Sequence, residues 1–168
     1  MQLRSATHAD AAAIAAIYNE GIEDREATFE TLPRTPGEVA EWLGEPGPFL
    51  VGEDGGTLLG FARVSAYSDR CVYAGVGEHG VYVARAARGA GAGRALLEGL
   101  CAAAAADGYY KLTSRIFTSN AASRAVHRAA GFEEVGIQRR HGKLDGEWRD
   151  CVLVERLLGE AATSLRVP

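Results

Sequence analysis

The sequence predicts an α/β fold in which a mixed β-sheet is flanked by helices within one domain. Its length of 168 residues is that of one ordinary domain. Its composition, with 47% hydrophobic and 24% charged residues, is typical of a globular chain. Segments with the two-residue period of strands alternate with segments of helical spacing, in the order β-α-α-β-β-β-α-β-α-β-β. A glycine-rich segment, residues 88–93, joins a predicted strand directly to a predicted helix.

Two helices are predicted near the start of the chain, after a short strand at residues 2–5. The capping pattern Thr7–Asp10 predicts a helix that continues to about Gly21. A second capping pattern, with proline at the first helical position, predicts a helix over residues 35–44. The polar loop between the two helices, residues 23–32, is long enough to indicate a functional role.

The remaining chain is dominated by strands. Strands are predicted at 49–51 and 58–66 around the hairpin turn 54–56, and another within 73–83. The apolar spacing between Leu96 and Ala104 predicts the helix that follows the glycine-rich segment. The later predicted elements are a strand at 109–117, a helix over 120–130 ended by Gly131, and strands at 132–138 and 148–157. We assign residues 1–160 to the domain and residues 161–168 to a C-terminal tail.

Composition and charge exclude several classes of protein. A net charge of −4 supplies no basic stripe for a phosphate backbone, so we expect no nucleic-acid partner. There is no apolar run of membrane-spanning length and no signal-peptide pattern at Met1–Arg4, so we expect a cytoplasmic protein without a membrane partner. The basic run 138–143 is typical of charges that protect a sheet edge. We expect reduced thiols and no metal site, because the cysteines lack metal-ligand spacing: Cys71, Cys101 and Cys151.

The glycine-rich segment predicts an anion site. A strand-to-helix turn points free helical N–H groups at its occupant, and glycines let the backbone approach phosphate oxygens, so a pyrophosphate is a good candidate. The Walker nucleotide-binding pattern is excluded, because Gly93 is followed by Arg94-Ala95 instead of lysine and a hydroxyl residue. The dinucleotide-binding fold is disfavoured, because no acidic residue follows around residues 111–114.

Arg88-x-x-Gly91-x-Gly93 resembles the acetyl-CoA pyrophosphate loop of the GNAT superfamily of N-acetyltransferases. A second match is the segment 120–123, followed by His127 and Gly131-Phe132, in the order and spacing of that superfamily. The resemblance covers essentially the whole chain, and it implies the GNAT fold, a mostly antiparallel central sheet and acetyl-CoA as co-substrate. The residues that it implies for cofactor binding are Val81, Tyr82, Val83, Arg88, Gly89, Ala90, Gly91, Ala92, Gly93 and Asn120.

Within the superfamily, the chain is most similar to the phosphinothricin and arsinothricin N-acetyltransferases. The segments that carry this similarity include 77–83 and 146–150. Segment 67–73 is closer to the arsinothricin branch, because the phosphinothricin enzymes have a lysine where Ser68 stands. The resemblance implies resistance through acetylation of the α-amino group of a small oxyanion-bearing amino acid. It also implies a homodimer whose last strands contribute to the neighbour's site.

The resemblance also implies catalytic roles. Glu78 corresponds to the glutamate base, and partial burial would suit it to take the proton of the amine. His127 occupies the slot of a tyrosine acid, from which it donates to the leaving sulfur or relays the proton of the amine. From the residues alone, the alternative for Glu78 is a strand residue paired with an arginine, and the alternative for His127 is a residue that packs or caps a helix. The residues implied for acceptor binding are Phe29, Tyr67, Arg70 and Tyr73.

Other functions remain open at this stage. With the same fold, the acceptor could be methionine sulfoximine, methionine sulfone, a polyamine or a protein N-terminus, and acidic residues in segment 20–26 would suit a polycation. A non-catalytic acyl-CoA sensor would bind the cofactor without turnover. A nucleotide-binding regulator is disfavoured by the missing Walker lysine.

Overall fold

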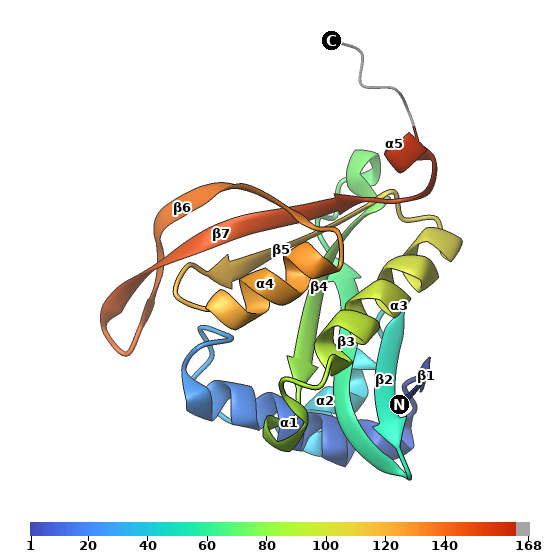
Figure 1. Ribbon diagram of the computed structural model, residues 1–168, viewed down its shortest axis with the longest axis vertical. Helices are drawn as coiled ribbons and strands as arrows, with labels where there is room; N and C mark the ends of the chain where they lie inside the picture. Colours follow the sequence, from blue (N-terminus) through green and yellow to red (C-terminus); the bar gives the residue numbers. More distant parts are fainter. Residues whose placement is uncertain (164–168) are drawn as a thin grey trace.

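Seven strands form one mixed sheet in the computed structural model, which describes residues 1–163 (Figure 1). The strand order is β1-β2-β3-β4-β5-β7-β6, and every neighbouring pair is antiparallel except β4 with β5. The predicted mixed, mostly antiparallel sheet is therefore confirmed. The strands are β1 (Gln2–Ser5), β2 (Phe49–Asp54), β3 (Thr57–Ala66), β4 (Val76–Val83), β5 (Lys111–Phe117), β6 (Glu133–Leu144) and β7 (Glu147–Leu157).

The helices follow the predicted order, with differences at their ends. Thr7 starts a 3-10 turn, His8–Asp10, and the α-helix itself continues past Gly21 until Arg25 adopts a left-handed conformation with φ 57°. The predicted cap at Thr35 is confirmed, and the structure adds a cap at Asn120; each side chain accepts a hydrogen bond from a backbone N–H. The helices are α1 (Ala11–Asp24), α2 (Pro36–Trp42), α3 (Ala92–Ala106), α4 (Ala121–Ala129) and α5 (Gly159–Thr163).

Two parts of the C-terminal region differ from the prediction. Strand β6 reaches Leu144, so the basic run 138–143 belongs to the strand instead of following it. Its pairing with β7 shifts register between Glu134 and Gly136 and again between Gln138 and Gly142, which local sequence period does not indicate. The predicted tail, 161–168, begins inside α5, and residues 164–168 lie outside the described part of the chain.

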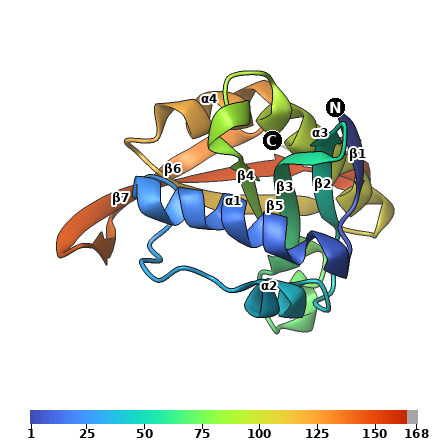
Figure 2. The same cartoon turned by 90° about the horizontal axis from the view of Figure 1, so that it is seen from below.

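Helices cover both faces of the sheet (Figure 2). On one face, α1 and α2 bury Ile14 and Val39 against Phe61 of β3. On the other face, α3 buries Leu96 and Leu100 against the sheet and against the chain that follows α4. Burial of apolar area in these two layers is the main stabilising contribution. Within residues 1–163, no helix is both long and apolar enough to cross a membrane.

The sheet splits between its two parallel strands. β4 pairs with β5 only over Val76–Glu78, although β4 continues to Val83 and β5 to Phe117. Beyond Glu78 the two strands diverge, as Figure 1 shows. Because strand edges carry free N–H and C=O groups, this divergence offers main-chain hydrogen bonds to an extended ligand.

Candidate active site

A cavity of about 750 Å³ occupies the place where β4 and β5 diverge. This volume lies in the range of roughly 300–1,000 Å³ that is usual for small-molecule sites. The wall combines the second half of β4, the end of β5, the start of α3, the first turns of α4 and the loop between α1 and α2. The predicted site residues that line it are Phe29, Glu78, Val81, Tyr82, Val83, Arg88, Gly89, Gly91, Ala92, Gly93, Asn120 and His127.

The glycine-rich turn forms one end of the cavity. Gly89 and Gly91 have positive φ angles of 80° and 86°, which glycine adopts without steric cost. A Cβ placed on either residue would meet no atom within 4 Å, so both face open space. Gly91 caps α3 without a side-chain hydrogen bond, and the free N–H groups of the first helical turn line the cavity with Ala92 and Gly93. This geometry fits the pyrophosphate of a coenzyme.

Arg88 lines the same end but is held by other residues. Its Nη1 donates to Asp24 Oδ2 at 2.6 Å, and its Nε donates to the Val83 carbonyl at 3.2 Å. The guanidinium groups of Arg88 and Arg85 hold the pKa of Asp24 below its usual range. Arg88 therefore ties the turn to the end of α1, while Ala90 lies outside the lining of the cavity.

Glu78 lies at the point where the strands separate. Its side chain is 42% exposed, so the partial burial that would suit a base is modest. Its Oε1 lies 3.7 Å from Nη1 of Arg115, on the neighbouring strand β5. Arg115 Nε in turn donates to Gln138 Oε1 of β6 at 2.9 Å. The carboxylate thus faces the cavity beside a cation that β5 and β6 position.

His127 is buried in the cavity wall against a second histidine, His79. The two side chains are on α4 and β4, their exposed fractions are 3% and 4%, and their Nε2 atoms are 3.0 Å apart. His127 Nδ1 lies 2.8 Å from the Ser123 carbonyl oxygen. Burial lowers the pKa of His127, and burial together with repulsion from His127 lowers the pKa of His79 to about 3. Both rings are therefore neutral at physiological pH.

The loop between α1 and α2 closes the other end of the cavity. Phe29 packs edge-on against Phe117 of β5, with ring centroids 4.8 Å apart. Gly142 of β6 makes room for the ring, because a Cβ there would lie 2.8 Å from Phe29. The loop is also tied to α4, where Asn120 Nδ2 donates to the Glu26 carbonyl at 3.0 Å. Asn120 Oδ1 accepts from the Ser123 N–H, so the residue implied for cofactor binding also holds two protein segments together.

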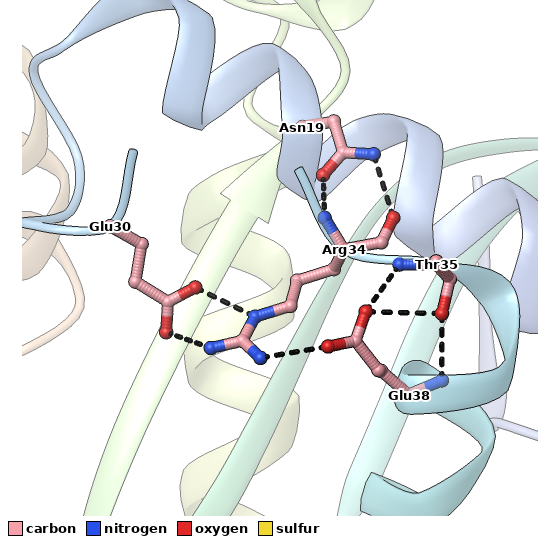
Figure 3. Close-up of polar contacts among 5 residues, drawn as sticks. All are labelled: Asn19, Glu30, Arg34, Thr35 and Glu38. Atoms are coloured by element: carbon pink, nitrogen blue, oxygen red, sulfur yellow. Dashed lines mark hydrogen bonds and ion pairs between the residues drawn. The ribbon is translucent and has the colours of Figure 1, made fainter. Parts of the chain in front are cut away.

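A polar cluster fixes the far end of this loop (Figure 3). Asn19 of α1 accepts from the Arg34 N–H at 2.8 Å and donates to the Arg34 carbonyl at 2.9 Å. The Arg34 guanidinium makes two hydrogen bonds to Glu30 and one to Glu38, which also completes the capping box with Thr35. The loop that carries Phe29 is therefore anchored at both ends.

A family model, described as the acetyltransferase (GNAT) family, matches residues 14–132 of this chain. The chain belongs to the GNAT acetyltransferase family. The strand split, the glycine-rich turn and the cavity thus belong to an acetyltransferase fold, which confirms the predicted family and fold.

Curated relatives of this GNAT domain acetylate amino-acid analogues according to their names. The phosphinothricin N-acetyltransferase of Alcaligenes faecalis is 36% identical over 161 residues, which cover 93% of this chain and 82% of that protein. The L-methionine sulfoximine/L-methionine sulfone acetyltransferase of Pseudomonas aeruginosa is 32% identical, covering 91% of this chain and 92% of that protein.

Solved structures agree with the assignment to GNAT. A phosphinothricin acetyltransferase from Sinorhizobium meliloti, in complex with acetyl-CoA, superposes with a TM-score of 0.90 at 34% identity, covering 98% of this chain and 91% of that chain. A ribosomal-protein-alanine N-acetyltransferase from Brucella melitensis has a TM-score of 0.89 at 34% identity, covering 94% of this chain and 100% of that chain.

Three of the residues implied for acceptor binding lie away from this GNAT cavity. Tyr67, Arg70 and Tyr73 form an exposed cluster on the connection between β3 and β4, where the two tyrosine rings meet edge to face and Arg70 lies over Tyr73. None of the three lines the cavity within one chain. Their role in acceptor binding stays a prediction.

Several cavity residues with titratable side chains are not among the predicted site residues. His79, Arg115, His141 and Cys151 all line the cavity, and they come from four different strands. Two sequence signals cover these residues: segment 77–83, which carries the resemblance, contains His79, and the basic run 138–143, which favours edge protection, contains His141. Burial raises the pKa of the Cys151 thiol, so it is protonated at neutral pH and is a poor nucleophile.

Proposed function

We propose that this protein transfers the acetyl group of acetyl-CoA to the α-amino group of a small oxyanion-bearing amino acid of the phosphinothricin or arsinothricin type. The observation that carries the proposal is one continuous cavity that joins the glycine-rich turn to Glu78 and Arg115. The names of the relatives support an amino-acid analogue as the acceptor. Acetylation of such a compound would confer resistance to it.

Acetyl-CoA fits the cavity in a defined direction. Its pyrophosphate would lie at Gly89–Gly93, where free N–H groups and the positive end of the α3 dipole face the cavity. Its pantetheine arm would follow the free edge of β4, residues 81–83, beyond the last pair with β5. A backbone N–H of this edge would polarise the thioester oxygen. The thioester carbon then lies near Glu78, between the two diverging strands.

The transfer is direct, within a ternary complex. Glu78 takes a proton from the ammonium group of the acceptor, directly or through water, and the neutral amine attacks the thioester carbon. The new N–C bond forms and the C–S bond breaks; the nitrogen loses its second proton as the amide forms, and the departing thiolate of CoA takes up a proton. We assign His127 to the relay of the amine proton, because its Nδ1–H is held by the Ser123 carbonyl and only Nε2 carries a lone pair. Cys151 forms no covalent intermediate, since its thiol is protonated.

The anionic group of the acceptor requires a cation, and the structure favours Arg115 over Arg70. Within residues 1–163, the arginines that line the cavity are Arg88 and Arg94 at the cofactor end and Arg115 beside Glu78. A guanidinium can hold two oxygens of a phosphinate or arsinate at once. Arg115 is already oriented by Gln138, which reduces the entropy that it loses on binding.

We further propose that the enzyme acts in the cytoplasm as a homodimer. Strand β6 is an edge strand of the sheet, and the β6–β7 hairpin projects beyond the other elements (Figure 1). Val135 and Ile137 of β6 and Trp148 of β7 are each more than half exposed. Apolar side chains on a free strand edge favour association with a second chain. The last strands could in this way reach the neighbour's site.

A second acceptor class is favoured by the comparisons. Relatives from Pseudomonas aeruginosa and Salmonella typhimurium are named for methionine sulfoximine and methionine sulfone, and they are 32% and 33% identical to this chain. These acceptors share the α-amino acid group but lack the negative side-chain charge of a phosphinate. They would therefore depend less on Arg115.

Thiol release from acetyl-CoA tests the proposal, with arsinothricin, phosphinothricin, methionine sulfoximine and spermidine compared side by side. We expect turnover of the first two, and a loss of at least about 100-fold in kcat for Glu78→Gln. Arg115→Met should raise KM for the acceptor about tenfold, the effect of one lost charge-assisted contact, without changing KM for acetyl-CoA. Arg70→Met is the matched control. If KM for the acceptor rises in Arg70→Met and not in Arg115→Met, the anionic group is bound by Arg70.

Other outcomes would contradict parts of the proposal. If only methionine sulfoximine or spermidine is acetylated, the proposed acetyltransferase activity stands, but the proposal of an oxyanion-bearing acceptor is rejected. Tight CoA binding without turnover of any acceptor, unchanged in Glu78→Gln, would indicate a non-catalytic acyl-CoA sensor.

A further inference from the structure

We infer that the hydroxyl of Ser114 donates a hydrogen bond to the sulfur of CoA as the thiolate departs. The inference rests on the proposed function, because it assigns a further catalytic residue to the same transfer. Ser114 is on β5 and lines the cavity where β4 and β5 separate. The last pair that joins the two strands is Glu78 with Thr113, so Ser114 is the first residue of β5 beyond it.

Ser114 and the proposed base point to opposite faces of the sheet. Side chains alternate along a strand, so Ser114 shares a face with Leu112 and Ile116, which belong to the core that α3 covers. Arg115, the next residue, points to the other face, where Glu78 lies beside it. Figure 2 shows α3 and α4 on one side of the sheet and α1 and α2 on the other. The base therefore faces the loop at the acceptor end, and Ser114 faces the helices of the cofactor end.

The sulfur of acetyl-CoA would reach the split from the side of Ser114. The turn proposed for the pyrophosphate and the residues of α4 that line the cavity are on this side. The amine approaches from the side of Glu78, so the C–S bond breaks toward Ser114 and leaves its electron pair on sulfur. The Ser114 hydroxyl keeps its own proton and offers it as a hydrogen bond to the thiolate, which then takes up a proton from water. A hydrogen bond to an ionised group is stronger than one between neutral groups, so the contact favours the departing thiolate over the intact thioester.

The hydroxyl of Ser114 is available for this contact. Within residues 1–163, the hydroxyl groups in the cavity lining belong to Thr28, Tyr82, Ser114 and Ser123. The other three each contact a protein group, whereas the Ser114 hydroxyl makes no hydrogen bond within this part of the chain. Ser114 is half-buried between the buried Leu112 and Ile116, where alanine would form the same wall without an unpaired polar group. Once the cofactor displaces water from the cavity, the hydroxyl needs a partner on the ligand.

The two histidines on this face offer no free N–H to the sulfur. His127 holds its Nδ1–H on the Ser123 carbonyl, and its Nε2 lies 3.0 Å from His79 Nε2. The remaining nitrogen of His79, Nδ1, is buried. Among the described residues, Ser114 is therefore the side-chain donor of this face that is free at the split.

The ionisation of bound CoA tests the inference without an acceptor. The ultraviolet absorbance of the thiolate follows this ionisation when it is read against the complex with desulfo-CoA, which lacks the sulfur, at each pH. In Ser114→Ala the bound thiol should ionise about one pH unit higher than in the wild type, because the hydrogen bond to the charged form is lost. Ser114→Thr keeps a hydroxyl and should restore most of the wild-type value. Glu78, Arg115 and the two histidines also lie at the split, but they are the same in all three proteins.

Binding and single-turnover measurements separate the contact with sulfur from a general effect on the site. Ser114→Ala should bind desulfo-CoA with an unchanged Kd, which also shows that the variant folds. Its Kd for CoA should rise about tenfold at a pH where the thiol is ionised. With an acceptor that the wild type acetylates, the rate of acetyl transfer in a single turnover should fall at least about tenfold, with KM for the acceptor unchanged.

The outcomes distinguish this inference from the proposed function. A bound thiol that ionises at the same pH in the wild type and in Ser114→Ala would overturn the inference, because a serine that only fills space predicts no difference. An unchanged single-turnover rate in Ser114→Ala would overturn it as well. The expected difference in ionisation, in a protein that acetylates no acceptor, would support the contact with sulfur and reject the proposed function.

Discussion

Acidification should destabilise the protein through its buried histidine pair. An unfolded histidine has a pKa of about 6.5, whereas burial lowers the pKa of His79 to about 3 in the folded chain. Between these values the unfolded chain binds more protons, so the free energy of unfolding decreases as pH falls. From pH 8 to pH 5 the loss from His79 alone is about 2 kcal/mol, and the lowered pKa of His127 adds a loss of the same sign.

This pH window separates the histidines from the carboxylates. Arg4 holds the pKa of Asp10 well below its usual range, and Asp24 and Glu134 are shifted in the same direction by their arginine partners. The stability that these carboxylates contribute is lost mainly below about pH 5, as the unfolded carboxylates become protonated. Stability lost between pH 8 and pH 5 therefore reports the buried rings.

Urea unfolding followed by tryptophan fluorescence at pH 8, 7, 6 and 5 measures the effect. His79→Phe should lose at least about 2 kcal/mol less than the wild type over this range. His8→Gln, which changes an exposed histidine, is the matched control and should behave like the wild type. A wild-type loss below about 0.5 kcal/mol, at a constant urea m-value, would refute the neutral buried pair.

Three further predictions concern the cofactor turn and the loop. In steady-state kinetics, Gly91→Ala should raise KM for acetyl-CoA several-fold, because a Cβ would fill space that faces the cavity. Gly108→Ala is the control, because Gly108 also has a positive φ and open surroundings but lies away from this cavity. This variant should leave KM for acetyl-CoA unchanged. Asn19→Ala should lower the free energy of unfolding in urea by about 1–2 kcal/mol, since it removes both hydrogen bonds to Arg34, and Asn19→Asp should lose less because it keeps the acceptor. Asn120→Ala should lower the free energy of unfolding by about 1 kcal/mol, because the helix cap is lost. It should also raise KM for the acceptor, because Asn120 holds the loop through the Glu26 carbonyl. An unchanged KM would show that this contact has no part in acceptor binding.

The order of the elements could be predicted because its signals are local. A capping box needs only residues four positions apart, and Thr35 with Glu38 forms the predicted one. The start of the helix at Asn120 is predicted from equally local sequence, and in the structure the Asn120 side chain caps that helix. The glycine-rich turn was predicted for the same reason, since the strand before it and the helix after it are adjacent in the chain.

The residues that meet across the cavity could not be predicted in this way. Arg115 is oriented by Gln138 of β6, and the register of β6 depends on two bulges that its sequence period does not indicate. Arg70 is the cation that the sequence favours for the anionic group of the acceptor, yet it does not line the cavity and lies over Tyr73 on the connection between β3 and β4. His79 lies within segment 77–83, which carries the resemblance, but its contact with His127 has no local signal because the two residues are 48 positions apart.

The loop between α1 and α2 shows most clearly why the acceptor end needs the structure. Its own residues indicate only a polar segment with one phenylalanine. Its position depends on contacts with elements much later in the chain: Glu26 with Asn120, Phe29 with Phe117, and Arg25 with Asp145 in the β6–β7 turn. Since the shape of the acceptor end is set only after these elements have assembled, selectivity between a phosphinate and a sulfoximine follows from their packing and not from any single motif.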